Sequence, residues 1–370
     1  MSENTAQAVS EKRSRTKKSS PKHRWYFYVG IVCLAVLILL GAFLGFLTAT
    51  EYRPQPIEPA EIGITDVQTP YTGEALRILT FNTGYSGLDK STDFVMDGGK
   101  SAEPENAEIV KANMQGIGDI LQKADADICL LQEVDKNSSR TFHLNQWEQF
   151  ALDLPEYETC YAPNFKCHFV PYPLQAPIGS IDGGIATYSR YNMIDPLRHS
   201  LPVPFQWPVR TANLKRCLLV SRVPIQDTSK ELVLVNLHLE AYDDGEGKIA
   251  QTKQLVSLLQ EEYAKGNYVV AGGDFNQSFP DVKTEIKPTS EWVPGLLSEL
   301  PEQWKYVYDE TVPTCRLLNQ PYDPSSDLTQ HYVLDGFIVS PNVEVTKVET
   351  MDEQFTYSDH NPVVMEIKLK

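Results

Sequence analysis

The chain has 370 residues, of which 42% are apolar and 22% charged, and its formal net charge is −16. This composition is that of a globular protein and excludes an intrinsically disordered chain, and the length allows one large domain or two ordinary ones. An acidic chain has no bulk electrostatic footprint for nucleic acid, because contacts to phosphate come from Lys and Arg. The charge leaves open an enzyme that handles phosphate through a metal ion.

The charge is unevenly distributed along the chain. The first 24 residues carry +5 and the remaining 346 carry −21, and residues 25–50 have no charged side chain. This apolar stretch is long enough to cross about 30 Å of hydrocarbon as a helix. Trp25, Tyr26 and Tyr28 stand at its basic end, where amphipathic rings favour the membrane interface. We therefore predict a basic cytoplasmic tail over residues 1–24 and a transmembrane signal anchor over residues 25–50.

A cleaved signal peptide and a buried helix are the two alternatives to an anchor. A signal peptide has an apolar region of only about 7–15 residues and a cleavage site of small residues. This stretch is longer, and no good cleavage site follows it. Basic residues before the span and acidic residues after it orient the N-terminus toward the cytoplasm. We expect a single-pass protein of the cell membrane whose main domain is extracytoplasmic.

A linker is expected over residues 51–72, before a single domain over residues 73–370. The segment from residue 51 to residue 70 contains four prolines and few large apolar residues. Such a composition is typical of a semi-extended spacer. We find no internal repeat, low-complexity tract or second linker in the sequence that follows.

From residue 76 onward, strand patterns alternate with helical ones. Amphipathic spacing predicts helices at 107–123 and 249–263. Strands are expected at 77–82, 128–131, 185–188, 217–220, 232–239, 268–271, 332–339, 343–348 and 363–367. This order indicates an α/β domain with mixed sheets and helices outside. The connection over 281–330 is long and rich in Pro. Connections of that length usually have a function or contain small helices of their own.

Five of the six cysteines lie outside the apolar stretch, and an odd number cannot all pair internally. Cys129 and Cys217 stand in apolar runs and are expected to be small core residues. Cys160 and Cys167 are close enough in sequence to bridge, but spacing alone does not fix the geometry of a disulfide. Both the bridged and the free forms stay open at this point.

Polar residues stand at the ends of several predicted strands, where an apolar core would not select them. Each alone has a structural explanation, such as a turn, a solvated strand end or a hydrogen-bonded histidine. Strand ends at one edge of a sheet converge in space, which is where α/β folds place their sites. Four carboxylates, two amides and two histidines would then lie together in one site at the edge of the sheet: Asn82, Glu133, His238, Asp274, Asn276, Asp335, Asp359 and His360.

The oxygen-rich donors in this set favour Mg²⁺ over zinc, with Mn²⁺ and Ca²⁺ as alternatives. Mg²⁺ typically uses only one or two protein carboxylates and keeps room for water and substrate phosphate. The sequence has no Cys/His cluster of zinc spacing, no Gly-rich phosphate loop and no Gly-x-Ser-x-Gly turn. Asp335 stands inside an apolar run, so it needs a partner if it is buried.

Six segments in order resemble the endonuclease/exonuclease/phosphatase superfamily, which includes pancreatic deoxyribonuclease, apurinic endonucleases, neutral sphingomyelinases and inositol polyphosphate 5-phosphatases. They are LTFNTG, LLQEVD, NLHLE, GGDFN, LDGFIVS and SDHNP, and they run from residue 79 to residue 362. The resemblance implies a four-layer sandwich of two mixed β-sheets flanked by helices. It also implies a bacterial, membrane-anchored member that hydrolyses a phosphate ester with Mg²⁺.

The resemblance also implies roles for the residues around the metal and the attacking water. By motif position, Glu133 looks like the main metal ligand, with Asn82 and Asp359 near the ion. Asp274 matches the carboxylate that orients or deprotonates the attacking water. Asn276 would hold that carboxylate or a phosphate oxygen.

Two histidines complete the implied catalytic set. His360 matches the histidine at the scissile phosphate, and Asp335 matches the carboxylate that orients it and favours its charged form. His238 matches the second histidine of the deoxyribonuclease-like, sphingomyelinase-like and phosphatase-like branches, which apurinic endonucleases lack. The sequence leaves open whether Asp274 or His360 is the general base. We favour Asp274 as the base and His360 as the stabiliser of the transition state.

Three basic residues are weaker candidates for binding substrate. Arg190 ends a segment that resembles the family's strand ending in Ser-Arg, and it either meets phosphate or makes a structural ion pair. Lys166 and Arg140 stand in polar loops, where a solvated surface position is the alternative to a contact with substrate.

Three substrate classes fit this hypothesis: nucleic acid, membrane phospholipid or sphingomyelin, and small phosphorylated metabolites. The acidic domain disfavours long nucleic acid unless Lys166, Arg210, Lys215 and Arg216 form a local basic groove. An extracellular nuclease and a sphingomyelinase-like phospholipid hydrolase are therefore alternatives to a general phosphodiesterase or phosphatase. A non-catalytic binding module on the same fold is a further alternative, and we predict no protein partner.

Overall fold

The computed structural model describes residues 21–63, 67, 69–73, 75–243, 245–283, 292–326 and 328–370. Its contacts divide the chain into two units, Met1–Ala49 and Thr50–Lys370. The described part of the first unit is helix α1 (Pro21–Ala49). From Arg24 to Ala49 this helix is long and apolar enough to cross a membrane, a test that an N-terminal signal sequence also passes. Most of the predicted basic tail, residues 1–20, lies outside the described residues.

The second unit is built on two seven-stranded mixed β-sheets. The first sheet has the order β1 (Ile57–Pro59), β7 (Ile194–Ser200), β8 (Cys217–Pro224), β9 (Glu231–His238), β10 (Tyr268–Asp274), β16 (Asp335–Val339), β13 (Lys305–Val307). The second has the order β17 (Val343–Thr350), β18 (Val363–Leu369), β3 (Leu76–Asn82), β4 (Ile128–Asp135), β6 (Gly179–Ser189), β5 (Glu158–Val170), β2 (Glu61–Ile62). Each sheet has one parallel pair, β9–β10 and β3–β4, among antiparallel ones.

The two sheets pack face to face over an apolar core. Ile78 and Leu130 of the second sheet and Leu234, Val270 and Phe337 of the first belong to one buried cluster. Successive side chains of a strand point to opposite faces. The neighbours of these residues in sequence therefore point away from the central core, toward the helices.

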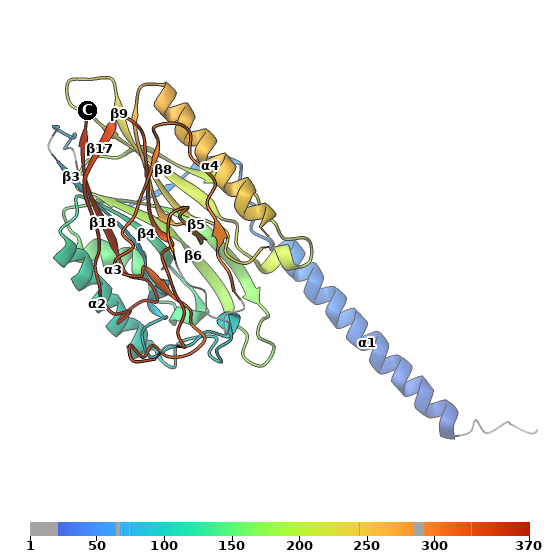
Figure 1. Ribbon diagram of the computed structural model, residues 1–370. Helices are drawn as coiled ribbons and strands as arrows, with labels where there is room; N and C mark the ends of the chain where they lie inside the picture. The colour runs from blue at the N-terminus through green and yellow to red at the C-terminus, as the bar shows by residue number, and fades with distance from the viewer. Residues whose placement is uncertain are drawn as a thin grey trace, which may run out of the picture. The chain divides into compact units, whose positions relative to one another are not determined.

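Helices cover the outer face of each sheet (Figure 1). Buried residues of α2 and α3, such as Val110 and Phe150, pack with Leu79 and Leu131 of the second sheet. Leu255 of α4 packs instead in the buried cluster on the first sheet. The bounds are α2 (Ala107–Ala124), α3 (Gln146–Asp153) and α4 (Glu246–Ala264). The predicted fold of two mixed sheets flanked by helices is thereby confirmed.

Short elements connect these layers. Four are single 3₁₀ turns, η1 (Gly84–Ser86), η2 (Val95–Asp97), η3 (Ser139–Thr141) and η4 (Val209–Ala212). Two are small ladders, β11 (Gln277–Ser278) with β12 (Gly295–Leu296) and β14 (Cys315–Arg316) with β15 (His331–Tyr332). Most of them lie in the long connections, including the one expected over 281–330, which also contains β13.

Residues 51–72 differ from the spacer that the sequence predicts. β1 pairs with β7 at the edge of the first sheet, and β2 pairs with β5 at the edge of the second. Ala60 and Tyr71 are buried in the core between the sheets. The prolines in this segment are compatible with short edge strands, where one face of the backbone needs no partner. The described residues of this segment therefore extend the second unit toward Thr50.

Of the two forms left open for Cys160 and Cys167, the structure has the free one, because all six cysteines are free. Both residues lie on the long strand β5. Seven residues along a strand span about 23 Å, far more than a disulfide can bridge. Cys129 and Cys217 are fully buried, as their apolar surroundings in the sequence predict.

Candidate active site

The sheet register brings three of the predicted site residues side by side. Asp274 ends β10, and it lies opposite His238 on the parallel strand β9 and opposite Asp335 on the antiparallel strand β16. Asn82 ends β3 in the other sheet, and its Nδ2 donates a hydrogen bond to Asp274 Oδ2 at 3.0 Å. This bond joins the two sheets at the edge where the polar strand ends converge.

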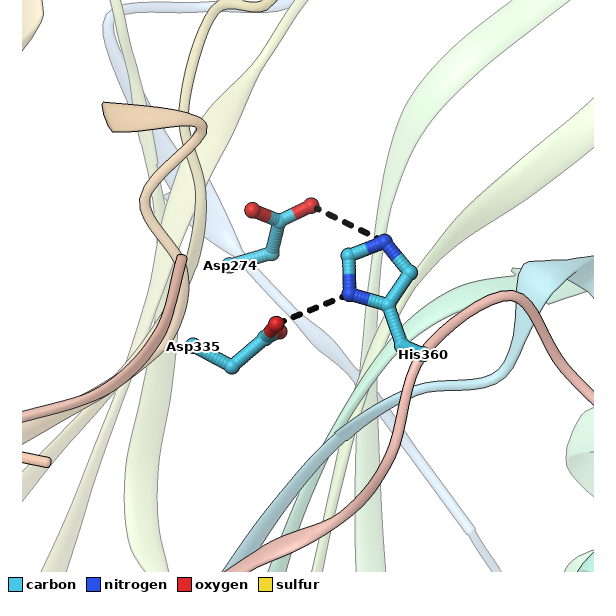
Figure 2. A group of neighbouring side chains, drawn as sticks. All are labelled: Asp274, Asp335 and His360. Atoms are coloured by element: carbon cyan, nitrogen blue, oxygen red, sulfur yellow. Dashed lines mark hydrogen bonds and ion pairs between the residues drawn. The ribbon is translucent and has the colours of Figure 1, made fainter. Parts of the chain in front are cut away.

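His360 and Asp335 form a buried pair beside Asp274 (Figure 2). His360 Nδ1 lies 2.8 Å from Asp335 Oδ2, and its Nε2 lies 3.9 Å from Asp274 Oδ2. Burial lowers the pKa of His360, but the charge of Asp335 raises it further, and the net result is well above the usual value. The pair therefore favours a charged imidazole whose Nε2 side faces Asp274.

Asp274 is held in one orientation by its neighbours. Asn276 donates its backbone N–H to Asp274 Oδ1 at 2.8 Å, and its side-chain amide lies 3.3 Å from Oδ2. Asn276 has a positive φ of 50°, a conformation that Asn adopts more readily than most residues. Burial, and after it the charge of Asp335, raises the pKa of Asp274 to about 6. A carboxylate of this kind can both accept and release a proton near neutral pH.

An irregularity in β4 accompanies Glu133. The pairing of β4 with β6 shifts register between Leu131 and Val134, and Glu133 has a φ of 54°. Such bulges re-aim side chains, and they are frequent beside active sites. Thr83 Oγ1 donates to the carbonyl of Glu133 at 3.0 Å, and Asn82 Nδ2 lies 3.4 Å from Glu133 Oε1. The bulge thus lies at Glu133, whose carboxylate is part of the site.

Glu133 and Asp359 form an oxygen-rich cradle with Asn82. Burial raises the pKa of Glu133, and burial together with the charge of Glu133 raises the pKa of Asp359 to about 7. Gly84 lies so close that a Cβ added there would stand 2.7 Å from Asp359 Oδ1. The carboxylates of the partly exposed Glu133 and the buried Asp359 are donors that suit a hard divalent cation such as Mg²⁺. Asn82 turns its Nδ2 toward Glu133, and its Oδ1 accepts from the backbone N–H of Gly84 at 3.1 Å. The residues therefore fit the metal that the sequence predicts.

A second group of ligand atoms, from Asp274, Asp335 and His360, lies within 4.8 Å of one another. One nitrogen of His360 is already engaged by Asp335. This arrangement matches a histidine held by a carboxylate, whereas Glu133 and Asp359 offer only oxygen atoms as metal donors.

His238 lies on the other side of Asp274. Its Nε2 is 3.5 Å from Asp274 Oδ2 and 4.0 Å from Glu133 Oε1. Burial, and after it the charge of Arg216, lowers the pKa of His238 well below its usual value. The ring is therefore neutral near pH 7, which differs from the charged state favoured for His360.

The three weaker candidates do not converge on this centre. Arg140 makes two bonds of 2.9 Å to Asp135 and stacks on Tyr85, so it stands near Glu133 with its guanidinium committed. Lys166 pairs with Asp182 at 3.1 Å on the surface. These contacts make Lys166 a solvated surface residue and Arg140 a neighbour of the site.

Arg190 lies at the opposite end of its sheet. It follows β6, whose last residue, Ser189, pairs with the first residue of β4, whereas Glu133 is close to the last. Arg190 forms ion pairs with Asp125 at 2.5 Å and Asp127 at 3.6 Å. Arg190 therefore makes a structural ion pair, which was one of its two predicted roles, and it does not lie at the site.

Two neighbours of the site, Arg316 and Ser358, were not among the predicted site residues, although Ser358 opens the SDHNP segment. Arg316 is buried, donates its backbone N–H to Asp359 O at 3.0 Å and directs its guanidinium to the carbonyl of Asp89 at 2.7 Å. Ser358 donates its hydroxyl to Asn82 O at 2.8 Å. The one signal for Arg316 was a cation among apolar residues in the sequence CRLL.

A model of a family described as "Endonuclease/Exonuclease/phosphatase family" matches residues 79–360. No match is found among the curated proteins. A solved endonuclease/exonuclease/phosphatase from Beutenbergia cavernae is 18% identical with a TM-score of 0.55, and the match covers 80% of this chain and 72% of that one.

Two further solved structures have similar folds. A protein of the same family from Bacteroides vulgatus is 18% identical with a TM-score of 0.51, covering 80% of this chain and all of that one. Truncated TDP2 from Caenorhabditis elegans is 15% identical with a TM-score of 0.51, covering 82% and 100%. At these identities the three structures show a common fold.

Proposed function

Because this chain belongs to the endonuclease/exonuclease/phosphatase family, we propose that it is a metal-dependent hydrolase of phosphate esters on a membrane-anchored, outward-facing domain. It acts as a phosphodiesterase or a phosphatase. The observation that carries the proposal is the position of Asp274, between the Asp335–His360 pair and the cradle of Glu133, Asp359 and Asn82. A water-activating carboxylate, a charged histidine and a metal cradle are the groups that phosphate ester hydrolysis requires.

Members of the family usually use divalent metal ions, and Mg²⁺ fits this chain best, with Mn²⁺ and Ca²⁺ as alternatives. Glu133, Asp359 and Asn82 would hold the ion. When bound, it supplies positive charge to the phosphate oxygens and to the leaving oxygen.

Side chains of the protein take the remaining catalytic roles. Asp274 is the general base, because its pKa of about 6 leaves it largely ionised at neutral pH while it still accepts a proton. Asn276 and Asn82 fix its carboxylate toward the attacking water. His360, kept charged by Asp335, stabilises negative charge on the phosphate. His238 offers a neutral ring beside them.

Two alternatives concern substrate and activity. An extracellular nuclease and a sphingomyelinase-like phospholipid hydrolase use the same site and differ in the groove around it. A non-catalytic binding module is disfavoured, because every position of the predicted catalytic set is occupied by a residue able to act. We place the domain outside the cytoplasmic membrane from the charge bias around the apolar helix. Protection of the C-terminal part from added protease in intact cells would contradict that placement.

The decisive experiment assays the full chain on DNA, RNA, sphingomyelin, inositol phosphates and nucleotides, with and without EDTA. We expect hydrolysis of at least one substrate with Mg²⁺ or Mn²⁺ and none with EDTA. Asp274→Ala and His360→Ala should each lower the rate by a factor of about 100 or more without changing Tm. The surface variant Asp119→Asn serves as a control that keeps full activity. Well-folded protein that hydrolyses none of these would favour the binding module.

A further inference from the structure

A cavity of about 400 Å³ beside β7 and β8 collects cations in an acidic chain. Its lining includes five basic side chains and a single acidic one: Arg53, Arg198, Arg210, Lys215, Arg216 and Glu51. Arg198, Lys215 and Arg216 are buried, and their head groups bind carbonyl oxygens and carboxylates of the protein, such as Pro163 O for Arg198 and Glu240 for Arg216. Buried cations are costly unless an anion stabilises them. The cavity therefore has the charge of an anion site.

The chain's own carboxylate shows that these side chains converge on an oxyanion. Glu51 Oε1 lies 3.0 Å from Arg210 Nε and 3.3 Å from Lys215 Nζ, and its Oε2 lies 3.0 Å from Arg53 Nη2. Two further acids, Glu58 and Glu240, lie near Arg198 and Arg216 at 3.8 and 3.3 Å. Three acids thus face the five cations, and positive charge remains in excess.

Two exposed apolar residues stand within three positions of Arg210, which lines the cavity. The side chains of Trp207 and Val209 are 53% and 59% exposed. A tryptophan ring favours the interface of a membrane, and Lys and Arg beside it meet lipid phosphates. A nucleic-acid groove needs the cations but gives no role to an exposed valine. The combination favours a lipid surface over a nucleic acid.

The sequence position of the cavity supports the same conclusion. Glu51 follows Ala49, the last residue of the apolar helix, by two positions. Consecutive Cα atoms are 3.8 Å apart, so this path spans at most about 8 Å. If the helix spans a membrane, as proposed above, the covalent chain keeps Glu51 close to its surface.

We propose that this cavity binds the phosphate group of an anionic phospholipid in the membrane that holds the anchor. The headgroup phosphate lies among Arg53, Arg210 and Lys215, and Trp207 enters the headgroup layer. The site is separate from the hydrolytic centre and depends on the proposed anchoring alone. Arg216 connects the two regions, because it lines the cavity and donates a hydrogen bond to His238 O at 3.2 Å.

The test measures binding by the full chain in non-ionic detergent with EDTA present, so that hydrolysis does not enter. Dihexanoyl phosphatidylglycerol, dihexanoyl phosphatidylcholine, inorganic phosphate and a single-stranded oligonucleotide are titrated separately. The readout is tryptophan fluorescence, with Trp207→Phe identifying the contribution of Trp207. We expect saturable binding of phosphatidylglycerol and a change in the Trp207 signal, and no binding of phosphatidylcholine.

Charge variants distinguish binding at the cavity from unspecific electrostatic attraction between the lipid and the protein surface. Arg53→Gln with Arg210→Gln should weaken binding of phosphatidylglycerol about twenty-five-fold, at about five-fold for each cation. Glu51→Gln should strengthen binding, a change that a purely structural role would not produce. The matched control, Lys123→Gln with Lys265→Gln, removes two exposed cations elsewhere and should leave binding unchanged.

Each other outcome overturns the assignment. Equal binding of phosphatidylcholine would show an unspecific detergent-like effect, and equal binding of inorganic phosphate would show a free-phosphate site. Preference for the oligonucleotide would make the cavity part of a nucleic-acid groove. A failure of the hydrolase proposal would not change these results, because no turnover is measured.

Discussion

Glu133 combines a left-handed backbone with a carboxylate that is only partly exposed and has a raised pKa, and each of these features costs stability. A residue chosen for folding alone would have neither. The site therefore concentrates negative charge for a purpose other than the stability of the fold, and the sequence motif LLQEVD reflects that purpose.

We expect Glu133→Gln to raise Tm in EDTA while it abolishes the response of Tm to Mg²⁺. Removing the charge relieves its repulsion with Asp359, and removing the ligand weakens binding of the metal to the native state. Thermal unfolding in EDTA and in 10 mM Mg²⁺ (roughly saturating for a typical site) measures both effects. A variant that keeps the wild-type increase of Tm with Mg²⁺ would show that Glu133 is not a ligand.

Asp335 controls the pH dependence of the proposed reaction. Burial lowers the pKa of His360 and Asp335 raises it, so Asp335→Asn should lower that pKa. Charged His360 then disappears at a lower pH, and the alkaline limb of kcat/KM moves toward acid. The pKa of Asp274, which burial and Asp335 raise to about 6, falls as well, so the acidic limb moves the same way. A pH–rate profile with unmoved limbs would remove Asp335 from this role.

Several residues of the candidate site stood out in the sequence because they are polar side chains at the ends of apolar runs, as Asn82 and Asp274 are at the ends of β3 and β10. Arg190 was misleading for a geometric reason. The motif ends in Ser-Arg, but β6 runs antiparallel to β4, so its last residue lies at the start of β4. Strand direction is a property of the fold that no local pattern contains. Arg316 was missed because it lies in a long connection without periodicity.

At the scale of elements, α4 is fastened to the first sheet by a charge cluster around Glu262. Arg222 of β8 donates to both oxygens of Glu262 at 2.6 and 2.9 Å, and Lys265 Nζ lies 2.8 Å away. Burial raises the pKa of Glu262, but the bonds from Arg222 and Lys265 lower it to about 2 from a usual 4.5. Folding therefore favours the ionised form.

We expect Glu262→Gln to lower the free energy of unfolding by up to about 3 kcal/mol at pH 7. Because the folded pKa lies below the unfolded one, this contribution is present above pH 4.5 and is lost as the pH falls toward 2. Urea unfolding at pH 7 and pH 3 measures the difference, with the exposed neighbour variant Glu261→Gln as control. An equal loss at both pH values would argue that the cluster acts through packing.

Periodicity located α2, α4 and most central strands, because their apolar faces repeat with the period of the element. It missed β5, where Pro163 and polar residues interrupt the alternation and the pairing with β6 shifts register beside that proline. It also missed β1 and β2, which are too short to show a period. Such edge strands depend on partners far away in the sequence, Arg198 and Cys160 among them.

At the scale of the whole molecule, the segment before residue 73 contributes to the fold. A chain that begins at Thr50 should fold with a Tm close to that of the second unit in the full protein. A chain that begins at residue 73 loses β1, β2 and the buried Tyr71, and it exposes the edges of β7 and β5. We expect it to melt at lower temperature and to aggregate in size-exclusion chromatography. Identical behaviour of the two chains would show that the edge strands are dispensable.

The early entry of the chain into both sheets bears on how substrate is found. Only seven residues separate Ala49 from the start of β1, and Glu51 among them is already bound by three cations. With the helix in a membrane, so short a tether confines the domain to a thin layer above the bilayer. Encounters with the proposed active site would then become a search in two dimensions, which favours molecules that diffuse within the membrane plane over molecules dilute in the surrounding medium.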